Sequence, residues 1–225
     1  MADLGIHNLA LFVLAGWALN LTPGPDVFYM VTHALKSGLR AGTVAVAGIC
    51  AGCLVHVTAA TVGLSALIAA SATAFTVLKW VGAAYLVYVG FKMLTSKADP
   101  GAMQIVAARA HPTMLSSGFS YRKVFLQGFW TNALNPKVAL FFLAFLPQFI
   151  SPTAAHPSLA FLFLGVLFIV NSLPVNMAYV LLAAWLSQRA AVQRGLNNFT
   201  LWLERVAGAV FIAFGIKLAL SETSR

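Results

Sequence analysis

The stretch NLTPGPDVFYM, from Asn20 to Met30, places two prolines, a glycine and an aspartate inside a long apolar run. That run covers about residues 8–32 and is otherwise long enough to cross a bilayer as one helix. Proline lacks an N–H and clashes with the preceding turn, so Pro23 and Pro25 predict a break in the helix. Backbone groups freed within hydrocarbon are tolerated only where they face protein or line a cavity. The stretch therefore predicts a broken membrane helix with a polar centre.

The composition indicates an integral membrane protein. Only 8% of the 225 residues are charged and 60% are hydrophobic, with a mean hydropathy of +0.87, whereas soluble domains carry about 25% charged residues. Such a chain cannot cover a water-facing surface, so we expect a single membrane domain. The net charge of +9 does not indicate a nucleic-acid partner, because the basic residues lie between apolar runs, where they set orientation in the membrane.

The N-terminus and the cysteines predict neither a signal peptide nor a disulfide. The N-terminus lacks a basic region and a small-residue cleavage site, and its apolar run is long, so we expect no cleavable signal peptide. Cys50 and Cys53 both lie inside an apolar run and predict no disulfide framework.

Six apolar runs are long enough to cross the hydrocarbon core, at about 20 residues each. They cover about residues 8–32, 42–69, 74–95, 124–150, 158–186 and 201–220. The fold class that we expect is all-α, with six transmembrane helices in one domain over residues 1–225. The connection at about 96–123 is either a plain linker or carries one short surface helix.

Lysines and arginines predict the orientation, because they occupy the loops after the first, third and fifth runs. Loops 70–73 and 151–157 contain neither residue. With six spans the basic loops all fall on one side, which is cytoplasmic by the positive-inside rule. We therefore expect both termini on the periplasmic or extracellular side. The basic residues are Lys36, Arg40, Lys92, Lys97, Arg109, Arg122, Lys123, Arg189, Arg194 and Arg205.

The two halves of the chain, about residues 1–95 and 124–220, resemble each other. Each half holds three runs, an odd number, so the second half would enter the membrane from the opposite side. Such an inverted repeat is typical of secondary transporters. Chance similarity between apolar helices is the alternative. The residues that match at equal spacing are Phe12, Trp17, Leu21 and Pro23 in the first run and Phe125, Trp130, Leu134 and Pro136 in the fourth.

The stretch TNALNPK, residues 131–137, predicts a second break in the fourth run. Both breaks lie about 16–20 Å along a helix from the basic side, which is near the midplane. Thr22 and Asn135 suit the N-caps of the helices that restart, and exposed N–H groups at a helix start favour an anion such as a carboxylate. A structural kink is the plainer interpretation. The candidate binding residues are Thr22, Pro23, Gly24, Pro25, Asp26, Asn135, Pro136, Lys137 and Asn176.

Asp26 and Lys137 are ionisable residues within apolar runs. Placing either near the midplane costs on the order of 3 kcal/mol, so each needs a partner or a function. They either pair with each other, or bind a zwitterion, with Lys137 on the carboxylate and Asp26 on the ammonium. Asp26 could also carry a coupled proton. A static ion pair that joins the two helices is the structural alternative.

Polar residues in the other runs allow two interpretations each. Asn176, with Asn171, Pro174 and Tyr179 in the fifth run, either lines a cavity or bonds one helix to another. A soft metal could bind Cys50, Cys53 and His56, but close packing around one polar residue explains them better, so we expect neither metal nor cofactor. No P-loop, HExxH motif or nucleophile elbow is present, so we expect no enzyme.

Four segments together resemble the LysE/RhtB family of bacterial amino-acid exporters, over essentially the whole chain. They read LTPGPDVFYMV, GLRAGTVAVAGICAG, LKWVGAAYLVYVGFKML and FWTNALNPKVALFFLAFLPQF. The resemblance implies an inner-membrane exporter of amino acids or small derivatives, driven by the proton gradient. It carries Pro23, Gly24, Pro25 and the triplet 135–137 over as motif positions. The role of Asp26 rests on the cost of its burial.

The expected partners are thus a small-molecule substrate, protons and the lipid bilayer, with a homo-oligomer left open. Two other functions remain as alternatives. Export of a metal or small cation would need Asp26, His56 and the cysteines to converge in one cavity. A non-transporting membrane scaffold would have breaks filled by packed side chains, with Asp26 and Lys137 locked together.

Overall fold

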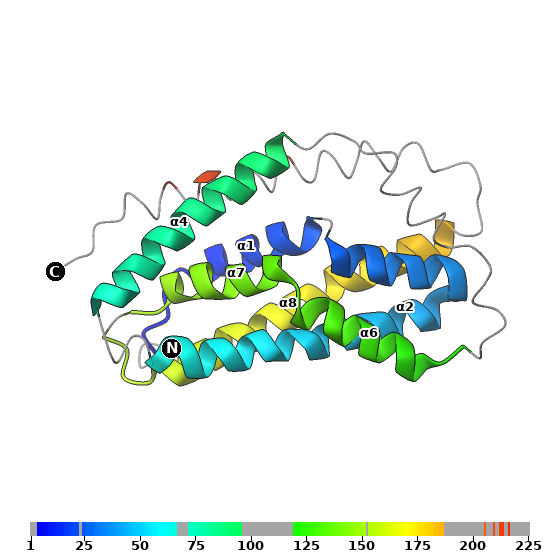
Figure 1. Ribbon diagram of the computed structural model, residues 1–225, viewed down its shortest axis with the longest axis horizontal. Coiled ribbons are helices and arrows are strands. Elements are labelled where there is room, and N and C mark those ends of the chain that lie inside the picture. The colour runs from blue at the N-terminus through cyan, green and yellow to red at the C-terminus, as the bar shows by residue number, and fades with distance from the viewer. Residues whose placement is uncertain are drawn as a thin grey trace.

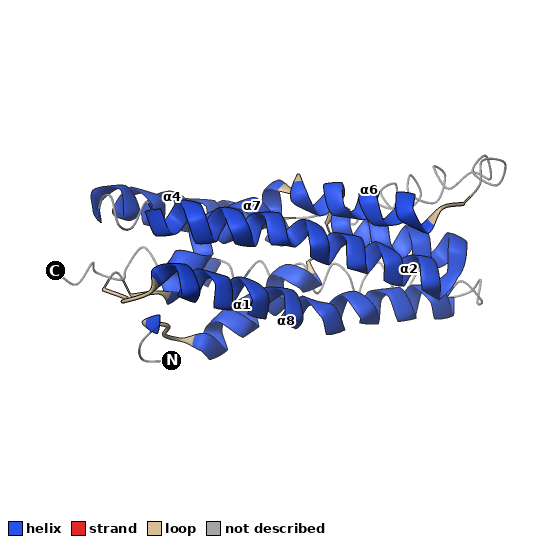
Figure 2. Ribbon diagram, turned by 90° about the horizontal axis from the view of Figure 1, so that it is seen from below, coloured by secondary structure: helices blue, strands red, loops and turns tan. Residues whose placement is uncertain are grey.

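The described part of the protein is a bundle of helices. The computed structural model describes residues 4–22, 24–66, 72–95, 119–151 and 153–186, with single positions 205, 209, 212, 213 and 216. The helices run mainly along one long axis (Figures 1 and 2). The elements are α1 (Leu9–Leu21), α2 (Pro25–Ala59), the π-helix η2 (Ala60–Leu64), α4 (Ala72–Leu94), α6 (Tyr121–Ala133), α7 (Pro136–Phe145), the 3-10 helix η4 (Leu146–Phe149) and α8 (Pro157–Leu186).

Both predicted breaks are present. The first separates α1 from α2, and Thr22 between them is extended, with φ −80° and ψ 120°. The second separates α6 from α7 and bends the path by 46°. Pro25 and Pro136 begin the downstream helices, a position where the missing N–H removes no helical bond. Both breaks lie near the middle of the long axis (Figure 1).

Helix α2 reverses direction at Gly38, as the predicted loop between the first two runs requires. Gly38 has φ 79° and ψ −179°, a conformation that is essentially restricted to glycine. A Cβ on Gly42 would lie 2.8 Å from the Cβ of Ala34, whereas eight residues of straight helix span about 12 Å. The two arms of α2 therefore form a hairpin (Figure 1). The guanidinium of Arg40 lies 4.9 Å from the ring centroid of Tyr121, so the hairpin turn and the start of α6 share one end of the bundle.

The apolar character of these helices fits a membrane. By length and composition, two described segments can cross one, Pro25–Leu64, which includes the hairpin, and Pro157–Trp185, or three when the bent pair α6 and α7 counts as a span. Large apolar side chains also cover the outside of the bundle, and Leu134 is 74% exposed. Of the predicted sixth run, about 201–220, the structure describes only the five single positions named above, and residues 96–118 of the long loop lie outside the described residues.

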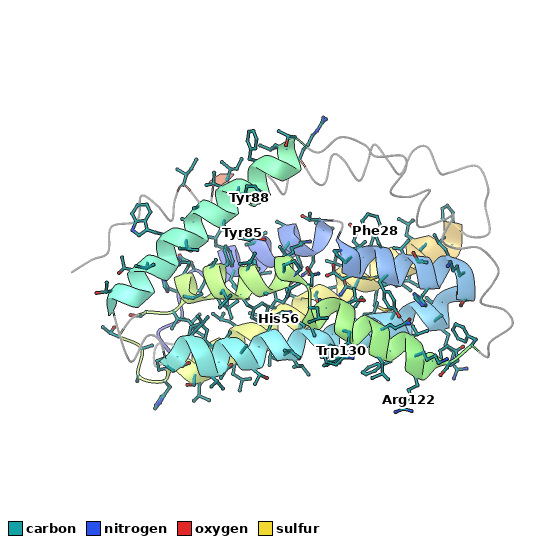
Figure 3. The ribbon with its side chains drawn as sticks, in the orientation of Figure 1. Phe28, His56, Tyr85, Tyr88, Arg122 and Trp130 are labelled. Atoms are coloured by element: carbon teal, nitrogen blue, oxygen red, sulfur yellow. The ribbon has the colours of Figure 1, made fainter. Side chains whose placement is uncertain are left out.

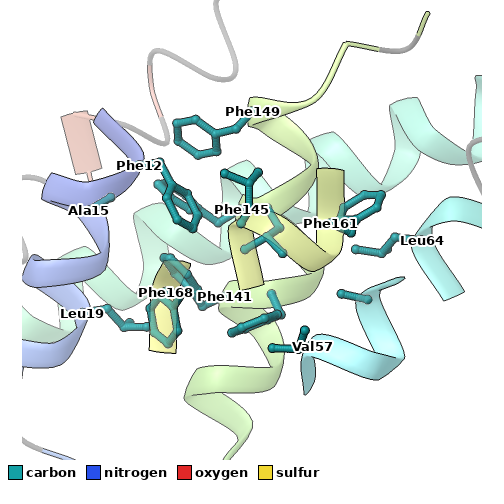
Figure 4. Close-up of a cluster of buried hydrophobic side chains, with 14 of the residues drawn as sticks. Phe12, Ala15, Leu19, Val57, Leu64, Phe141, Phe145, Phe149, Phe161 and Phe168 are labelled. Atoms are coloured by element: carbon teal, nitrogen blue, oxygen red, sulfur yellow. The ribbon is translucent and has the colours of Figure 1, made fainter. Parts of the chain in front are cut away.

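Two buried apolar clusters lie on either side of the breaks. The first joins α1, α7, η4 and α8 through ring contacts, with Phe145 4.6 Å from Phe141 and 4.8 Å from Phe149 between centroids (Figure 4). The second joins both arms of α2 to α6 and α8 around Met30 and Ile49. The polar centre at the breaks thus has apolar packing on both sides.

Glycines fix the register between the second arm of α2 and α6. A Cβ on Gly48 would overlap the carbonyl oxygen of Phe125, and one on Gly52 would overlap that of Phe129. Small residues of this kind allow helix backbones to touch in membranes. His56 lies four residues beyond Gly52 on the same helical face, so this packing carries it to the end of α6.

Candidate functional site

Lys137, in the first turn of α7, reaches across to the end of α1. Its Nζ donates to the carbonyl oxygens of Leu19 and Thr22, each at 2.8 Å. The last carbonyls of a helix lack intrahelical partners and form the negative end of its dipole, so a cation is favourable there. Lys137 therefore caps the half-helix that the first break leaves open.

Two hydroxyl groups donate hydrogen bonds to other carbonyl oxygens at this end of α1. Tyr179 Oη, from α8, donates to the carbonyl of Leu21 at 2.9 Å, and Thr22 Oγ1 donates to that of Ala18 at 2.7 Å. The prediction that Thr22 caps α2 is wrong, because Gly24 occupies the N-cap position. A threonine just past the end of α1 finds the carbonyl four residues earlier within reach of its hydroxyl.

Asn135 connects the starts of α7 and α2. Its Oδ1 accepts from the backbone N–H of Lys137 at 3.0 Å, which confirms the predicted N-cap. Its Nδ2 donates to Oδ1 of Asp26 at 3.1 Å. Asn135 is 2% exposed, so its side of both bonds is shielded from solvent, while Asp26 and Lys137 are half-buried.

The charged groups of Asp26 and Lys137 both flank the backbone of Gly24. A Cβ built on Gly24 would lie 2.9 Å from Oδ1 of Asp26 and 3.5 Å from Nζ of Lys137. Asp26 is in the first turn of α2, where the helix dipole favours a negative charge. The fold thus brings both sequence-predicted charges to one point, between the end of α1 and the starts of α2 and α7.

The remaining predicted residues lie around this point. Pro25 and Pro136 are the exposed first residues of α2 and α7. Asn176 is 6% exposed on α8, one turn before Tyr179, so the two share a helical face. Pro23 lies outside the described residues.

His56 closes the end of α6. Its Nε2 is 2.9 Å from the carbonyl oxygen of Asn132, so this nitrogen carries a proton and donates. The ring lies 6.0 Å from that of Phe142 between centroids, and Figure 3 shows it in the interior of the bundle. His56 therefore supplies a hydrogen-bond donor to a carbonyl at the end of α6, where the second break interrupts the helix. Within the described residues, no group of three or more His, Cys, Asp or Glu side chains could hold a metal.

Sequence reasoning missed two asparagines beside the breaks, Asn20 and Asn132. Nδ2 of Asn20 and Oδ1 of Asn132 are buried and have no hydrogen-bond partner. Each asparagine is the next-to-last residue of the half-helix that ends at a break, α1 or α6. The sequence alone does not reveal this shared position, because it depends on where α1 and α6 end. Tyr179 and Asn171, in contrast, bond α8 to α1, as one of their two interpretations predicted.

Comparison with known proteins identifies the family. The model of the LysE type translocator family matches residues 17–222. The chain is 32% identical over 210 residues to a homoserine/homoserine lactone efflux protein of Salmonella typhimurium, covering 92% of this chain and 94% of the relative. It is 28% identical over 222 residues to a leucine efflux protein of Klebsiella pneumoniae, covering 99% of each.

An uncharacterized membrane protein of Pseudomonas aeruginosa is 32% identical over 232 residues, with 100% of both chains covered. No solved structure matches the chain. The family match covers nearly all of the sequence, and the breaks at PGP and NPK both lie in the matched region. The protein therefore belongs to the LysE type translocator family, whose members are membrane transporters and not enzymes.

Proposed function

We propose that this protein exports amino acids or small amino-acid derivatives across the bacterial inner membrane, coupled to the proton gradient. The observation that carries the proposal is the meeting of two broken helices at a half-buried polar centre, where Asp26 and Lys137 flank Gly24. Ionisable groups of this kind inside a membrane bundle mark substrate and proton pathways. The efflux proteins among the relatives support export of amino-acid-like molecules.

The proposed architecture is one domain of six spans, built as two inverted three-helix repeats. The matching positions of the two breaks support this arrangement, since each follows a half-helix whose end is capped by a side chain from elsewhere in the bundle, Lys137 or His56. We place the basic loops in the cytoplasm and both termini outside. The halves would rock around the midplane to open the site to each side in turn.

The hydrogen bonds at the breaks suggest how substrate and proton could act. Lys137 and Asn135 belong to the second half, while their partners Leu19, Thr22 and Asp26 belong to the first. Movement of one half against the other must therefore exchange these bonds. A substrate carboxylate competes with backbone carbonyls for the Lys137 ammonium. A proton on Asp26, taken up from the outside, removes the negative charge that attracts the Asn135 amide and the substrate ammonium.

The test is export from cells loaded with dipeptides. Bacteria that overexpress the wild-type protein or Lys137→Ala receive a panel of dipeptides, and the free amino acids that appear outside are followed over time. We expect faster export of one class of amino acid, abolished by a protonophore and by Lys137→Ala. The exposed lysine Lys123 at the start of α6 supplies the control, and Lys123→Ala should export normally. An unchanged rate across the whole panel, at normal membrane expression, would overturn the proposal.

A further inference from the structure

We infer that Asn132 and Asn20 bind the two ends of the exported amino acid, with Asn132 Oδ1 accepting from the ammonium and Asn20 Nδ2 donating to the carboxylate. This inference rests on the proposed function and adds two binding residues to it. Because both groups recognise the part that all amino acids share, they would fix the orientation of the substrate and leave its side chain to other residues.

The first observation is that each amide has one buried polar atom without a hydrogen-bond partner, although Asn20 as a whole is only half-buried. Asn132 is 3% exposed, and its Oδ1 has no hydrogen-bond partner. Nδ2 of Asn20 is also buried without one. Most buried polar groups in folded proteins are satisfied, and each exception calls for an explanation, because the group has lost water and gained nothing. A ligand that enters the centre of the bundle would supply the missing partners.

The second observation is their equivalent position. Asn20 is the next-to-last residue of α1, and Asn132 is the next-to-last residue of α6. The breaks that follow them are tied together by the bonds from Lys137 to Thr22 and from Asn135 to Asp26. Asn20 and Asn132 therefore lie in the turns that lead into two linked breaks, and each comes from a different half of the chain.

The third observation is that the charged groups of the centre already have protein partners, which a substrate must displace before it reaches Lys137 or Asp26. Lys137 donates to two carbonyl oxygens of the first break, and Asp26 accepts from Asn135. Among the described residues beside the breaks, the buried side-chain atoms that still offer a bond are one amide N–H and one amide oxygen, on Asn20 and Asn132. An ammonium is a donor and a carboxylate is an acceptor, so a zwitterion complements this pair. Hydrogen bonds to ionised groups are about twice as strong as those between neutral groups.

Leucine substitutions separate binding from a structural role. Leucine has nearly the shape of asparagine and no polar atom, so Asn132→Leu and Asn20→Leu each remove an unsatisfied buried group. We expect unfolding temperatures in detergent equal to or above that of the wild type, with apparent affinity for the amino acid about tenfold or more weaker. Asn171 is the matched control, because its Nδ2 donates to the carbonyl of Val13 at 3.1 Å. Asn171→Leu should unfold at a lower temperature and keep its affinity.

Ligands that lack either the ammonium or the carboxylate show which asparagine binds which group. Purified protein in liposomes is assayed by counterflow of L-leucine, with 3-methylbutylamine and 4-methylpentanoate as competitors. A parallel set uses L-homoserine with 3-aminopropan-1-ol and 4-hydroxybutanoate. Asn132→Leu should weaken competition by the amino acid and the amine, and leave competition by the carboxylate unchanged. Asn20→Leu should weaken competition by the amino acid and the carboxylate, and leave competition by the amine unchanged.

Two outcomes overturn the inference and are distinguishable from each other. If the wild type transports an amino acid and both leucine variants bind it with wild-type affinity, the asparagines do not hold the substrate, and the proposed function stands. If the wild type shows no counterflow of any amino acid, the proposed function fails and the inference fails with it.

Discussion

The ammonium of Lys137 lies 2.8 Å from the carbonyl oxygen of Thr22, so the start of α7 caps the break that precedes α2. A residue of one broken helix thereby completes the other. Asn135 repeats this relationship through its bond to Asp26. Each break is only partly satisfied within its own helix, by Thr22 or Asn135, and also takes a bond from the other half of the chain.

Removal of the Lys137 side chain should damage both stability and transport. Lys137→Ala removes this donor from the carbonyl oxygen of Thr22, while that of Leu19 still accepts from the N–H of Thr22, and an unsatisfied buried group costs about 1–3 kcal/mol. We expect a lower unfolding temperature in detergent and loss of counterflow. Lys123→Ala, at an exposed position in α6, should change neither. An unfolding temperature of Lys137→Ala equal to that of the wild type would show that the lysine does not cap α1.

Two substitutions of Asn135 should separate its roles. Asn135→Ser keeps an oxygen that can cap α7 but loses the amide that donates to Asp26, whereas Asn135→Ala loses both. We expect Asn135→Ala to be less stable than Asn135→Ser by about 0.5–2 kcal/mol, the usual value of an N-cap. Chemical unfolding of the purified variants measures the difference. Equal stability of the two variants would contradict the capping role.

The glycines between α2 and α6 should not tolerate a methyl group. In Gly52→Ala the new Cβ would overlap the carbonyl oxygen of Phe129, so the helices must separate and carry His56 away from Asn132. We expect Gly52→Ala to unfold at a lower temperature and to transport poorly. No atom lies within 4 Å of a Cβ built on Gly63, so Gly63→Ala should behave as the wild type. Similar unfolding temperatures for both variants would contradict the close contact.

The hairpin turn of α2 should also be destabilised when Gly38 gains a side chain. Gly38 has φ 79° and ψ −179°, where a side chain costs of order 1–3 kcal/mol. No atom lies within 4 Å of a Cβ built there, so any loss of stability in Gly38→Ala comes from backbone strain and not from a clash. Thermal unfolding in detergent measures it. An unchanged unfolding temperature would mean that the turn relaxes into an ordinary conformation.

The orientation can be read from two small, exposed residues at opposite ends of the predicted topology, Ser37 and Ala155. In a variant without native cysteines, Ser37→Cys marks the hairpin turn and Ala155→Cys the loop before α8. We expect an impermeant thiol reagent added outside intact cells to label position 155 and not position 37, because the basic loops lie inside. Permeabilised cells should show labelling at both positions. The opposite pattern in intact cells would invert the topology.

Much of the helical framework could be predicted from the sequence because its signals are local. Pro25 and Pro136 determine where helices restart, since a missing N–H acts on its own turn. The turn at Gly38 falls in the expected loop between two apolar runs. Asn135 was also predictable as a cap, because capping depends only on the following residues.

The pairing of side chains across helices was not predictable in the same way. Thr22 turned back to α1, because a hydroxyl bonds the nearest free carbonyl. Lys137 and His56 proved to cap helices distant in sequence, which depends on how the halves pack. The unsatisfied amide of Asn132 is visible only once every neighbour is known, since a missing partner is a property of the folded chain.

The measurement that most directly tests proton-coupled amino-acid export at the paired breaks is gradient-driven transport by wild type and Asp26→Asn in proteoliposomes. L-Leucine and L-homoserine are offered with and without an imposed pH difference, alongside counterflow with no gradient. We predict that the gradient drives transport by the wild type, and that Asp26→Asn retains counterflow but no longer responds to the gradient. A wild type that ignores the pH difference, or an Asp26→Asn variant that responds to it as the wild type does, would contradict the account.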